Sequence, residues 1–591
     1  MTEGNLLFRH RSATEPTGDG RLRPSSRGFS ASHKSHLKKW FSRSLIAEGN
    51  ELSMLRNLQA SCRSSPSNDA VTMNNHLPGG RFPPRMARMI ILCGLLTAIP
   101  GALPGKSLEI GTQNQIFIDG RFLAERKNVQ IVVQQPRKTG EMMAFVSAEY
   151  LQVMEYDGVF KYFTLVSNDG SKWEKTTNND PKGEFRYGIY WSVPERPNGV
   201  VFKDPKAPPE ERYKVVSGMI NRVWATRDGS EWSQLRTNIF PEQISFPRGM
   251  DSQNVCFWDE KYECYVAYVR ANLEFEPPPQ HKEYFKNSRF HNQNNHLRCV
   301  RRCTSKDLKR FTTGEIVLAP DGNDPIMDGV GVGDFYMPQV IKYPHAQDAY
   351  VMFPNRYLHY QQWFMAEDLS HLPTNKPNEV LNDGPIDIGF AASRDGIKWN
   401  RYDRKPLVPL GRKGQFDWGG LYPVRGLIVK GEEMWLYYVA SADHGLPLPI
   451  KGREKGKVLS RVIFRKDGFT ALEADYPRGE FTTPVLRFSG DSLHLNVETS
   501  SLGLVRVEIQ DADGKPLPGF ALSDCDRIHT TNTTDAVVNW RRGKSSISSL
   551  AGKSVRLRFE LMYGAKLYAF GTQAASPGLP SDPPPGQEQS N

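Results

Sequence analysis

The sequence predicts an all-β protein in which a five-bladed β-propeller is followed by a C-terminal β-sandwich. Three observations support this fold class. A turn motif recurs between residues 115 and 475, aromatic strands of alternating polarity precede its copies, and no helical patterns of roughly 10 to 15 residues separate those strands. Parallel sheets connected by helices are therefore disfavoured.

The recurring motif has the pattern Ser/Thr-x-Asp-Gly-x-x-Trp, and we call each copy a turn box. The boxes lie at 167–173, 226–232 and 393–399, with a softened copy at 305–311 and a degenerate one at 465–469. Asp accepts hydrogen bonds from nearby backbone N–H groups and Gly supplies a positive φ, so each box is expected to be a hairpin turn. The steps between box starts are 59, 79, 88 and about 72 residues. Each step accommodates one four-stranded blade of roughly 40 to 50 residues with insertions.

The elements before and after the turn boxes complete the predicted domain organisation. The propeller is expected to span residues 113–480. Residues 485–573 contain short alternating strands between Asp-Gly and Gly-Lys turns, which is typical of a β-sandwich. Residues 574–591 are rich in Pro and lack apolar content, which predicts a disordered tail.

The N-terminal region is predicted to contain a leader that is removed. Residues 1–85 are rich in Ser, Arg, Asn and Pro and have no apolar period, so we expect a disordered extension, and we hypothesise that it comes from a mis-called start. Residues 86–105 combine a basic start, an apolar run and a small-residue exit, the pattern of a signal peptide. The run is shorter than the roughly 20 apolar residues that a membrane span needs. We therefore expect translation from Met86, a secreted or periplasmic protein, and no membrane span in the mature chain.

The charge of the chain first suggests a polyanionic partner. The 591 residues carry a formal net charge of +11, and 38% hydrophobic with 24% charged residues exclude a mostly disordered or collagen-like protein. Residues 1–105 account for most of that charge, and the remainder has a net charge of only +3. The mature protein therefore gives no electrostatic argument for a nucleic-acid partner.

The cysteines allow a disulfide in an exported protein. A hairpin that turns at residues 259–261 would place Cys256 opposite Cys264, so this pair is the disulfide candidate, with Cys299 and Cys303 as the alternative. The spacings lack the short Cys-x₂-Cys unit of zinc sites. We predict no metal and no cofactor.

Several motifs resemble the five-bladed propeller glycosidases that include glycoside hydrolase families 32 and 43. They are Ile116-Phe-Ile-Asp-Gly120, the turn boxes and Asp467-Gly468-Phe469, in a likeness that covers about residues 113–573. More closely, they resemble a group of secreted bacterial proteins related to those enzymes. The resemblance implies a glycosidase acting on oligo- or polysaccharide.

The same resemblance implies three catalytic carboxylates, one from each of the first three blades. Glu149 lies eight residues before Asp157-Gly158, as the nucleophile or base does in family 32, although its Asn, Pro and Gly neighbours are missing. Asp204, in Lys203-Asp-Pro, matches the stabilising Arg-Asp-Pro motif with Lys in place of Arg. Asp251, early in blade three, is the implied general acid. Such catalysis needs two carboxyl groups on either side of the glycosidic bond.

Further residues are candidates for substrate binding. Asp334 and Tyr336 lie in a segment that resembles the Asp-x-x-Tyr-x-Pro-Gln region of family 32, Arg270 can bind acidic sugar groups bidentately, and His444 follows a blade-five strand.

Two other functions stay open. One is a non-catalytic carbohydrate-binding or surface-interaction protein on the same scaffold, because a fold does not determine a function. The other is a sialidase-like enzyme, which the Asp-containing turn boxes suggest, although the box here is one residue shorter than that of sialidases.

Overall fold

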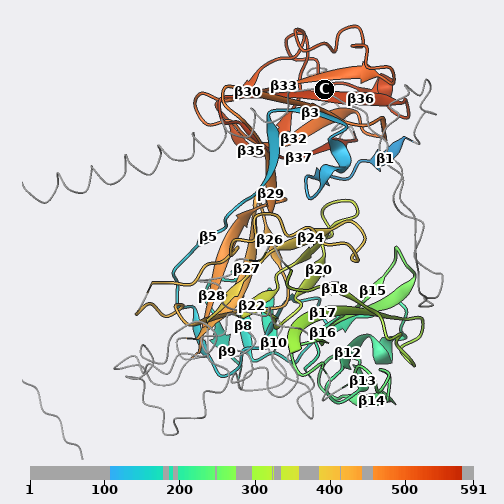
Figure 1. Cartoon of the computed structure of the whole chain (residues 1–591), viewed down its shortest axis with the longest axis vertical. Coiled ribbons are helices and arrows are strands. Elements are labelled where there is room, and N and C mark those ends of the chain that lie inside the picture. Colours follow the sequence, from blue (N-terminus) through green and yellow to red (C-terminus); the bar gives the residue numbers. More distant parts are fainter. Residues whose placement is uncertain are drawn as a thin grey trace, which may run out of the picture. The chain divides into compact units, whose positions relative to one another are not determined.

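The described residues form an all-β structure. The computed structural model describes residues 107–176, 185–190, 198–245, 249–274, 296–321, 324, 334–357, 385–412, 414–441 and 457–574 (Figure 1). Between the strands lie short 3-10 helices: η1 (Gly120–Phe122), η2 (Pro209–Glu211) and η5 (Ser548–Leu550). Within these ranges, no helix is long and apolar enough to cross a membrane. The predicted leader at 86–105 and tail at 574–591 lie almost entirely outside these ranges.

Three successive segments each form a four-stranded antiparallel sheet. Sheet 1 has the order β7-β10-β8-β9, from β7 (Gln152–Glu155), β8 (Leu165–Ser167), β9 (Glu174–Lys175) and β10 (Tyr187–Tyr190). Sheet 2 runs in chain order through β11 (Val201–Lys203), β12 (Tyr213–Ser217), β13 (Arg222–Thr226) and β14 (Ser233–Thr237). Sheet 3 also runs in chain order, through β15 (Val255–Asp259), β16 (Cys264–Glu274), β17 (His296–Ser305) and β18 (Glu315–Leu318).

Two further sheets follow. Sheet 4 has three strands, β20 (Val340–Lys342), β21 (Tyr350–Met352) and β24 (Ala391–Ser393). Sheet 5 has nine strands and the main order β19-β22-β23-β25-β27-β28-β5, with β26 beside β27 and β6 beside β28. Its strands are β5 (Arg137–Lys138), β6 (Ala144–Val146), β19 (Asp334–Phe335), β22 (Asn355–Tyr357), β23 (Ile386–Ile388), β25 (Gly420–Pro423), β26 (Ile428–Lys430), β27 (Glu433–Ser441) and β28 (Lys457–Arg465).

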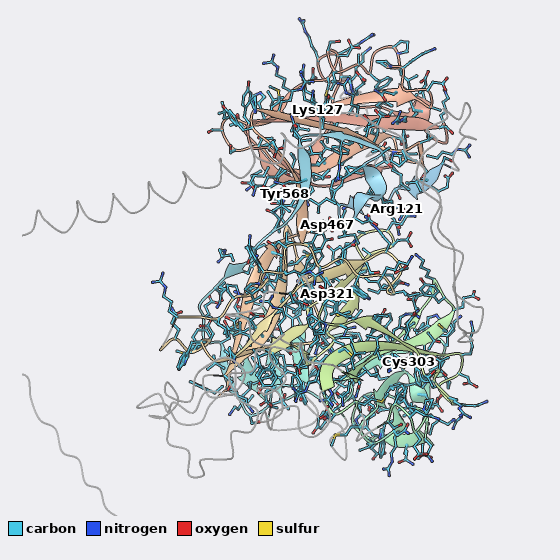
Figure 2. The ribbon with its side chains drawn as sticks, in the orientation of Figure 1. Arg121, Lys127, Cys303, Asp321, Asp467 and Tyr568 are labelled. Atoms are coloured by element: carbon cyan, nitrogen blue, oxygen red, sulfur yellow. The ribbon has the colours of Figure 1, made fainter. Side chains whose placement is uncertain are left out.

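The turn boxes form as predicted at the ends of strands. β8, β13, β17, β24 and β28 each end at the first residue of a box. In the three boxes with the full motif, the Gly N–H donates to the Ser or Thr hydroxyl at 2.9 Å, and the Asp carboxylate accepts from the backbone beyond. The fifth box differs, because its positive φ lies on Asp467, labelled in Figure 2.

Contacts join the first strands of sheets 1 to 3, or the residues next to them, and also join the first strand of sheet 1 to the segment after β25. A parallel bridge joins Gln152 to Arg425, and another joins Gly199 to Asn254. The Gln152 side chain also bonds both the N–H and the C=O of Val201 at 2.8 and 2.7 Å. The amino ends of these first strands therefore meet on one side of the structure.

The last two sheets contain the C-terminal strands together with strands from the start of the described chain. One has the order β1-β31-β36-β30-β3 with β33 and β34 attached, and the other β35-β32-β37-β29-β4 with β2 attached. The first contains β1 (Leu108–Gly111), β3 (Glu125–Lys127), β30 (Arg478–Thr482), β31 (Leu486–Phe488), β33 (Leu504–Asp511), β34 (Ile528–His529) and β36 (Val555–Met562). The second contains β2 (Gln115–Ile116), β4 (Val129–Val133), β29 (Thr470–Ala474), β32 (Ser492–Glu498), β35 (Asn532–Val537) and β37 (Lys566–Gln573).

One apolar core joins these two sheets. It contains Phe559 and Leu561 of β36 from the first sheet and Leu493 and Leu495 of β32 from the second, all 0% exposed. The recruitment of residues 108–133 into these sheets differs from the predicted boundaries, which placed residues 113–133 in the propeller. Alternation within a short strand shows that one face is buried but does not show which strand will pair with it.

The predicted Cys256–Cys264 disulfide is absent. All five cysteines of the described residues are buried free thiols. In the hairpin of β15 and β16, Cys256 lies opposite Ala267, and Cys264 lies opposite Asp259. The turn is centred later than the sequence suggested, which moves the two cysteines out of register. The alternative pair, Cys299 and Cys303, lies along the single strand β17 and is also unbonded.

Candidate functional site

Three of the predicted site residues lie at or just before the amino ends of strands. Glu149 precedes β7, Asp251 precedes β15, and Asp334 is the first residue of β19. Since these ends meet on one side, residues far apart in sequence are brought together there. His444 lies outside the described residues.

Two tyrosines connect the predicted carboxylates. The hydroxyls of Tyr150 and Tyr336 are 2.5 Å apart. Burial raises the pKa of Tyr150 well above its ordinary value, and Tyr336, Glu149 and Asp251 raise it further. Glu149, which is next to Tyr150 in the sequence, and Asp251 thus both contribute to the electrostatic environment of this one phenol.

Each of these two carboxylates faces a cation. The Lys457 ammonium lies 2.5 Å from Glu149, and the Arg270 guanidinium lies 2.8 Å from Asp251. The Arg270 side chain is 7% exposed, whereas Glu149 and Asp251 are 27% and 37% exposed. The carboxylates thus reach solvent while Arg270 supports one of them from within the protein.

Arg298 contacts Asp334 and two tyrosines near these carboxylates. It donates to Asp334 at 3.1 Å and lies over the rings of Tyr336 and Tyr357, 5.4 and 5.5 Å from their centroids. Burial lowers the pKa of Arg298, but Asp334 and the two phenols outweigh burial and raise it overall. Asp334 is 1% exposed, so its carboxylate mainly holds Arg298 in position.

Tyr422 of β25 is a further tyrosine affected by these groups. It is buried, and burial raises its pKa well above the ordinary value, followed by the effects of Glu149 and Tyr336. We call Tyr150, Tyr336, Tyr357 and Tyr422 the tyrosine cluster. Sequence reasoning found Tyr336, but it missed Tyr150, Tyr357, Arg298 and Lys457. Only the position of Tyr150 beside Glu149 offered a local signal.

Asp204 lies elsewhere, at the carboxyl end of β11. Its carboxylate binds the Lys214 ammonium at 2.7 Å and accepts from the Tyr265 hydroxyl at 2.8 Å. The Asp204 side chain is 0% exposed and Lys214 is 6% exposed. The structure therefore does not bring Asp204 to Glu149 and Asp251, and its contacts are those of an internal ion pair.

The same contact recurs in three successive sheets. Asp157, Asp204 and Asp259 each follow or end the first strand of their sheet. Each accepts a hydrogen bond from a tyrosine of the next sheet: the pairs are Asp157–Tyr213, Asp204–Tyr265 and Asp259–Tyr350. We call these the Asp–Tyr contacts. Repetition in three successive sheets indicates that Asp204 holds neighbouring sheets together.

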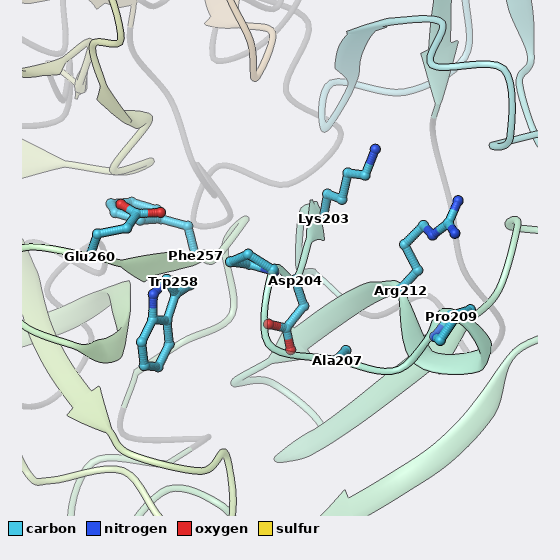
Figure 3. A pocket seen from close by; sticks show the side chains of 9 residues that line it. Lys203, Asp204, Ala207, Pro209, Arg212, Phe257, Trp258 and Glu260 are labelled. Atoms are coloured by element: carbon cyan, nitrogen blue, oxygen red, sulfur yellow. The ribbon is translucent and has the colours of Figure 1, made fainter.

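A cavity of about 400 Å³ lies beside Asp204. Figure 3 shows Lys203, Asp204 and Arg212 on one side of it and Phe257, Trp258 and Glu260 on the other. The Asp204 carboxylate is already bonded, so this cavity does not give it a catalytic position. Across the described residues, no group of three or more His, Cys, Asp or Glu side chains is arranged to hold a metal ion.

Comparisons with known proteins give distant structural likenesses. No family model matches the sequence, and no curated protein matches it. A solved structure described as a glycoside hydrolase is 12% identical, with a TM-score of 0.32, and the match covers 56% of this chain and 92% of that one. A structure from work on the GH130 family of mannoside phosphorylases is 11% identical, with a TM-score of 0.30, over 62% and 96% of the two chains. A glycoside hydrolase family 32 protein from Bifidobacterium adolescentis is 10% identical, with a TM-score of 0.23, over 72% and 99%. At these scores the likenesses identify neither the family nor the activity of this chain.

Proposed function

We propose that this chain is a secreted glycoside hydrolase-like protein, built on a five-bladed propeller with a C-terminal sandwich. Sheets 1 to 5 supply the blades, since a turn box follows a strand in each of them and their first strands are neighbours. The N-terminal strands β5 and β6 pair with β28 and so complete the last blade. The two C-terminal sheets with a common core form the sandwich.

The observation that carries the functional proposal is the meeting of Glu149 and Asp251 at the tyrosine cluster. They come from different sheets, they are partly exposed, and they act on the same phenol. Hydrolysis of a glycosidic bond requires one carboxyl group to protonate the leaving oxygen and another to act as base or nucleophile. We assign Asp251 as the acid and Glu149 as the base or nucleophile.

The surrounding residues suit a sugar. Tyr150 and Tyr336, which are only partly buried, offer apolar ring faces for stacking together with hydroxyls for hydrogen bonds. Arg270 and Arg298 supply fixed donors near the carboxylates and are each held by an aspartate. Asp334 is reassigned from direct substrate binding to the positioning of Arg298.

A glycan panel tests the proposal. We expect wild-type protein to hydrolyse at least one oligo- or polysaccharide, and Glu149→Gln or Asp251→Asn to reduce kcat by about 100-fold or more, because proton transfer contributes on that scale. Glu155→Gln is the matched control, since Glu155 is an exposed carboxylate of β7 that pairs with Arg186. Full activity in both site variants would reject the assignment.

A second function, carbohydrate binding without cleavage, is favoured by one observation. Lys457 and Arg270 each pair with one of the two carboxylates, and such pairing is also found where charges only shape a binding surface. The same panel distinguishes the two functions, because binding without any turnover by wild-type protein supports the binding module.

Secretion is proposed from the sequence at 86–105. N-terminal sequencing of the protein exported by its native host tests this proposal. We expect a mature chain that starts near residue 106, and a mature chain that contains Trp40 would overturn it.

A further inference from the structure

A serine, a histidine and an aspartate form a hydrogen-bonded chain on the C-terminal sheets, apart from the site described above. The Ser492 hydroxyl lies 2.7 Å from His494 Nε2, and His494 Nδ1 lies 2.7 Å from Asp535 Oδ1. The two ring nitrogens of His494 thus connect a hydroxyl to a carboxylate. This is the order in which a nucleophile, its base and the group that orients the base are arranged in hydrolases.

Strand geometry explains why these side chains meet. Leu493 and Leu495 of β32 are 0% exposed and face the core, so Ser492 and His494 project from the opposite face. On the neighbouring strand β35, Val537 lies opposite His494. Asp535, two residues before Val537, is the diagonal neighbour on the same face, within reach of a long side chain.

A fourth residue fixes the aspartate. Gln573 of β37 lies opposite Ser492 and donates from Nε2 to Asp535 Oδ1 at 2.8 Å. The His494 side chain is only 12% exposed, whereas Asp535 is 58% exposed. The imidazole is therefore held between its neighbours, and the half-buried Ser492 lies at the opposite end of the hydrogen-bonded chain from the exposed Asp535.

We propose that Ser492, His494 and Asp535 form a second active site, which hydrolyses short-chain carboxylic esters. The Ser492 oxygen attacks the ester carbonyl carbon while His494 Nε2 takes the hydroxyl proton. The ester C–O bond then breaks, and the alcohol leaves with that proton. Water, deprotonated by His494, attacks the acyl-serine, which releases the carboxylic acid and restores the Ser492 hydroxyl. No oxidant or cofactor is needed.

The surroundings of Ser492 define the acyl group. Ser546 lies opposite Ser492 in an antiparallel bridge and is exposed, and its hydroxyl lies 3.1 Å from that of Ser548, so one of these two hydroxyls is the proposed donor to the oxyanion. Val537, 39% exposed beside His494, offers a small apolar surface. An open sheet face with one small apolar contact suits an acetyl group better than a long acyl chain.

Covalent labelling tests the site directly. A fluorophosphonate is expected to add once to wild-type protein, with the adduct at Ser492 by peptide mass spectrometry, and not to add to Ser492→Ala. We also expect p-nitrophenyl acetate hydrolysis to fall by about 100-fold or more in Ser492→Ala and in His494→Asn. Ser554→Ala is the control, because Ser554 is a half-buried serine whose hydroxyl is bonded to Arg487 rather than to a histidine.

The result is independent of the glycosidase proposal. Glu149→Gln should label as wild type does, whatever its effect on glycans. If folded wild-type protein shows no adduct at Ser492, or if Ser492→Ala hydrolyses the acetate ester as fast as wild type, the second active site is rejected. A change in Tm of the variants without any loss of labelling would also reject it and would show that the chain only stabilises the sheet.

Discussion

At the scale of single residues, identical side chains have different roles because of their position along a strand. Asp251 lies before the first strand of sheet 3, reaches solvent and pairs with Arg270. Asp204 lies after the first strand of sheet 2 and is enclosed with Lys214 and Tyr265. The Asp-Pro motif at 204 therefore belongs to the Asp–Tyr contacts, and its similarity to a catalytic motif did not predict its position.

Asp204→Asn is expected to destabilise the protein by about 3 kcal/mol, because it leaves the buried Lys214 ammonium with only the more distant, exposed Glu211 carboxylate at 3.5 Å. Urea unfolding followed by tryptophan fluorescence measures this change. Glu155→Gln, at an exposed ion pair, should cost no more than about 0.5 kcal/mol. Equal stabilities of the two variants would contradict the structural role of Asp204.

The lowered pKa of Asp157 predicts how the stability of the protein depends on pH. Burial alone would raise its pKa, but hydrogen bonds from Lys203, Tyr213 and two backbone N–H groups outweigh burial and lower the pKa from 3.8 to about 2. A lowered folded-state pKa gives stability that is present above pH 4 and is lost as the pH falls toward 2. We expect Asp157→Asn to flatten this part of a stability–pH curve measured by urea unfolding, and an unchanged slope would contradict this explanation.

At the scale of elements, the turn boxes also connect sheets. The Tyr437 hydroxyl of sheet 5 donates to the Gly170 carbonyl in the first box at 2.6 Å, and the Tyr268 hydroxyl of sheet 3 donates to the Gly396 carbonyl in the fourth at 2.8 Å. In the softened box, Leu308 adopts the positive φ of 61° that Gly adopts in the full copies. The box is therefore a hairpin turn that also provides a contact surface for the neighbouring sheet.

Gly396→Ala is expected to be more destabilising than an alanine at another positive-φ glycine. A Cβ at Gly396 would lie 2.4 Å from the Tyr268 hydroxyl, and its φ is +69°. Gly431, with a φ of +60° and no atom within 4 Å of a Cβ, is the control for backbone strain alone. We expect a cost of about 1 kcal/mol for Gly431→Ala and of about 2 kcal/mol or more beyond that for Gly396→Ala, measured by urea unfolding. Similar costs would show that Tyr268 does not constrain the turn.

At the scale of the whole molecule, the first described residues contribute strands both to the two C-terminal sheets and to sheet 5. β1, β2, β3 and β4 pair with strands of the C-terminal sheets, whereas β5 and β6 pair with β28 of sheet 5. Residues 108–146 thus provide pairing partners for strands more than 300 positions later. The C-terminal sheets and sheet 5 both depend on this segment, because an unpaired strand edge exposes backbone donors and acceptors and favours aggregation.

A chain that begins at Ser147 is expected to lose cooperative unfolding and to aggregate, compared with a chain that begins at Ser107 and keeps β1 to β6. Removal of these strands leaves the edges of β28 and β29 open and removes Phe117 and Phe122, both 0% exposed, from the apolar core. Thermal unfolding and size-exclusion chromatography measure the difference. Equal Tm values and monomeric elution for both chains would show that the segment is dispensable.

The all-β character and the turn boxes could be predicted from the sequence because both depend on neighbours within a few residues. Alternation of polar and apolar side chains marks a strand, and Asp followed by Gly marks its turn. The boxes accordingly form at the expected residues. Strand alternation likewise places Ser492 and His494 on one face of β32. Nothing in the nearby sequence indicated that Asp535 would hydrogen-bond to His494.

The sequence by itself therefore determined the strands, the turns and which residues carry charge. Only the tertiary structure decided which groups face each other: Glu149 and Asp251 both raise the pKa of Tyr150, Asp204 is enclosed in an Asp–Tyr contact, and Cys256 lies out of register with Cys264. The physical reason is that strand register and sheet neighbours depend on packing between distant segments. A shift of one residue in the pairing register of a strand moves all of its side chains to the other face of the sheet. The sequence pattern of that strand is the same in both registers.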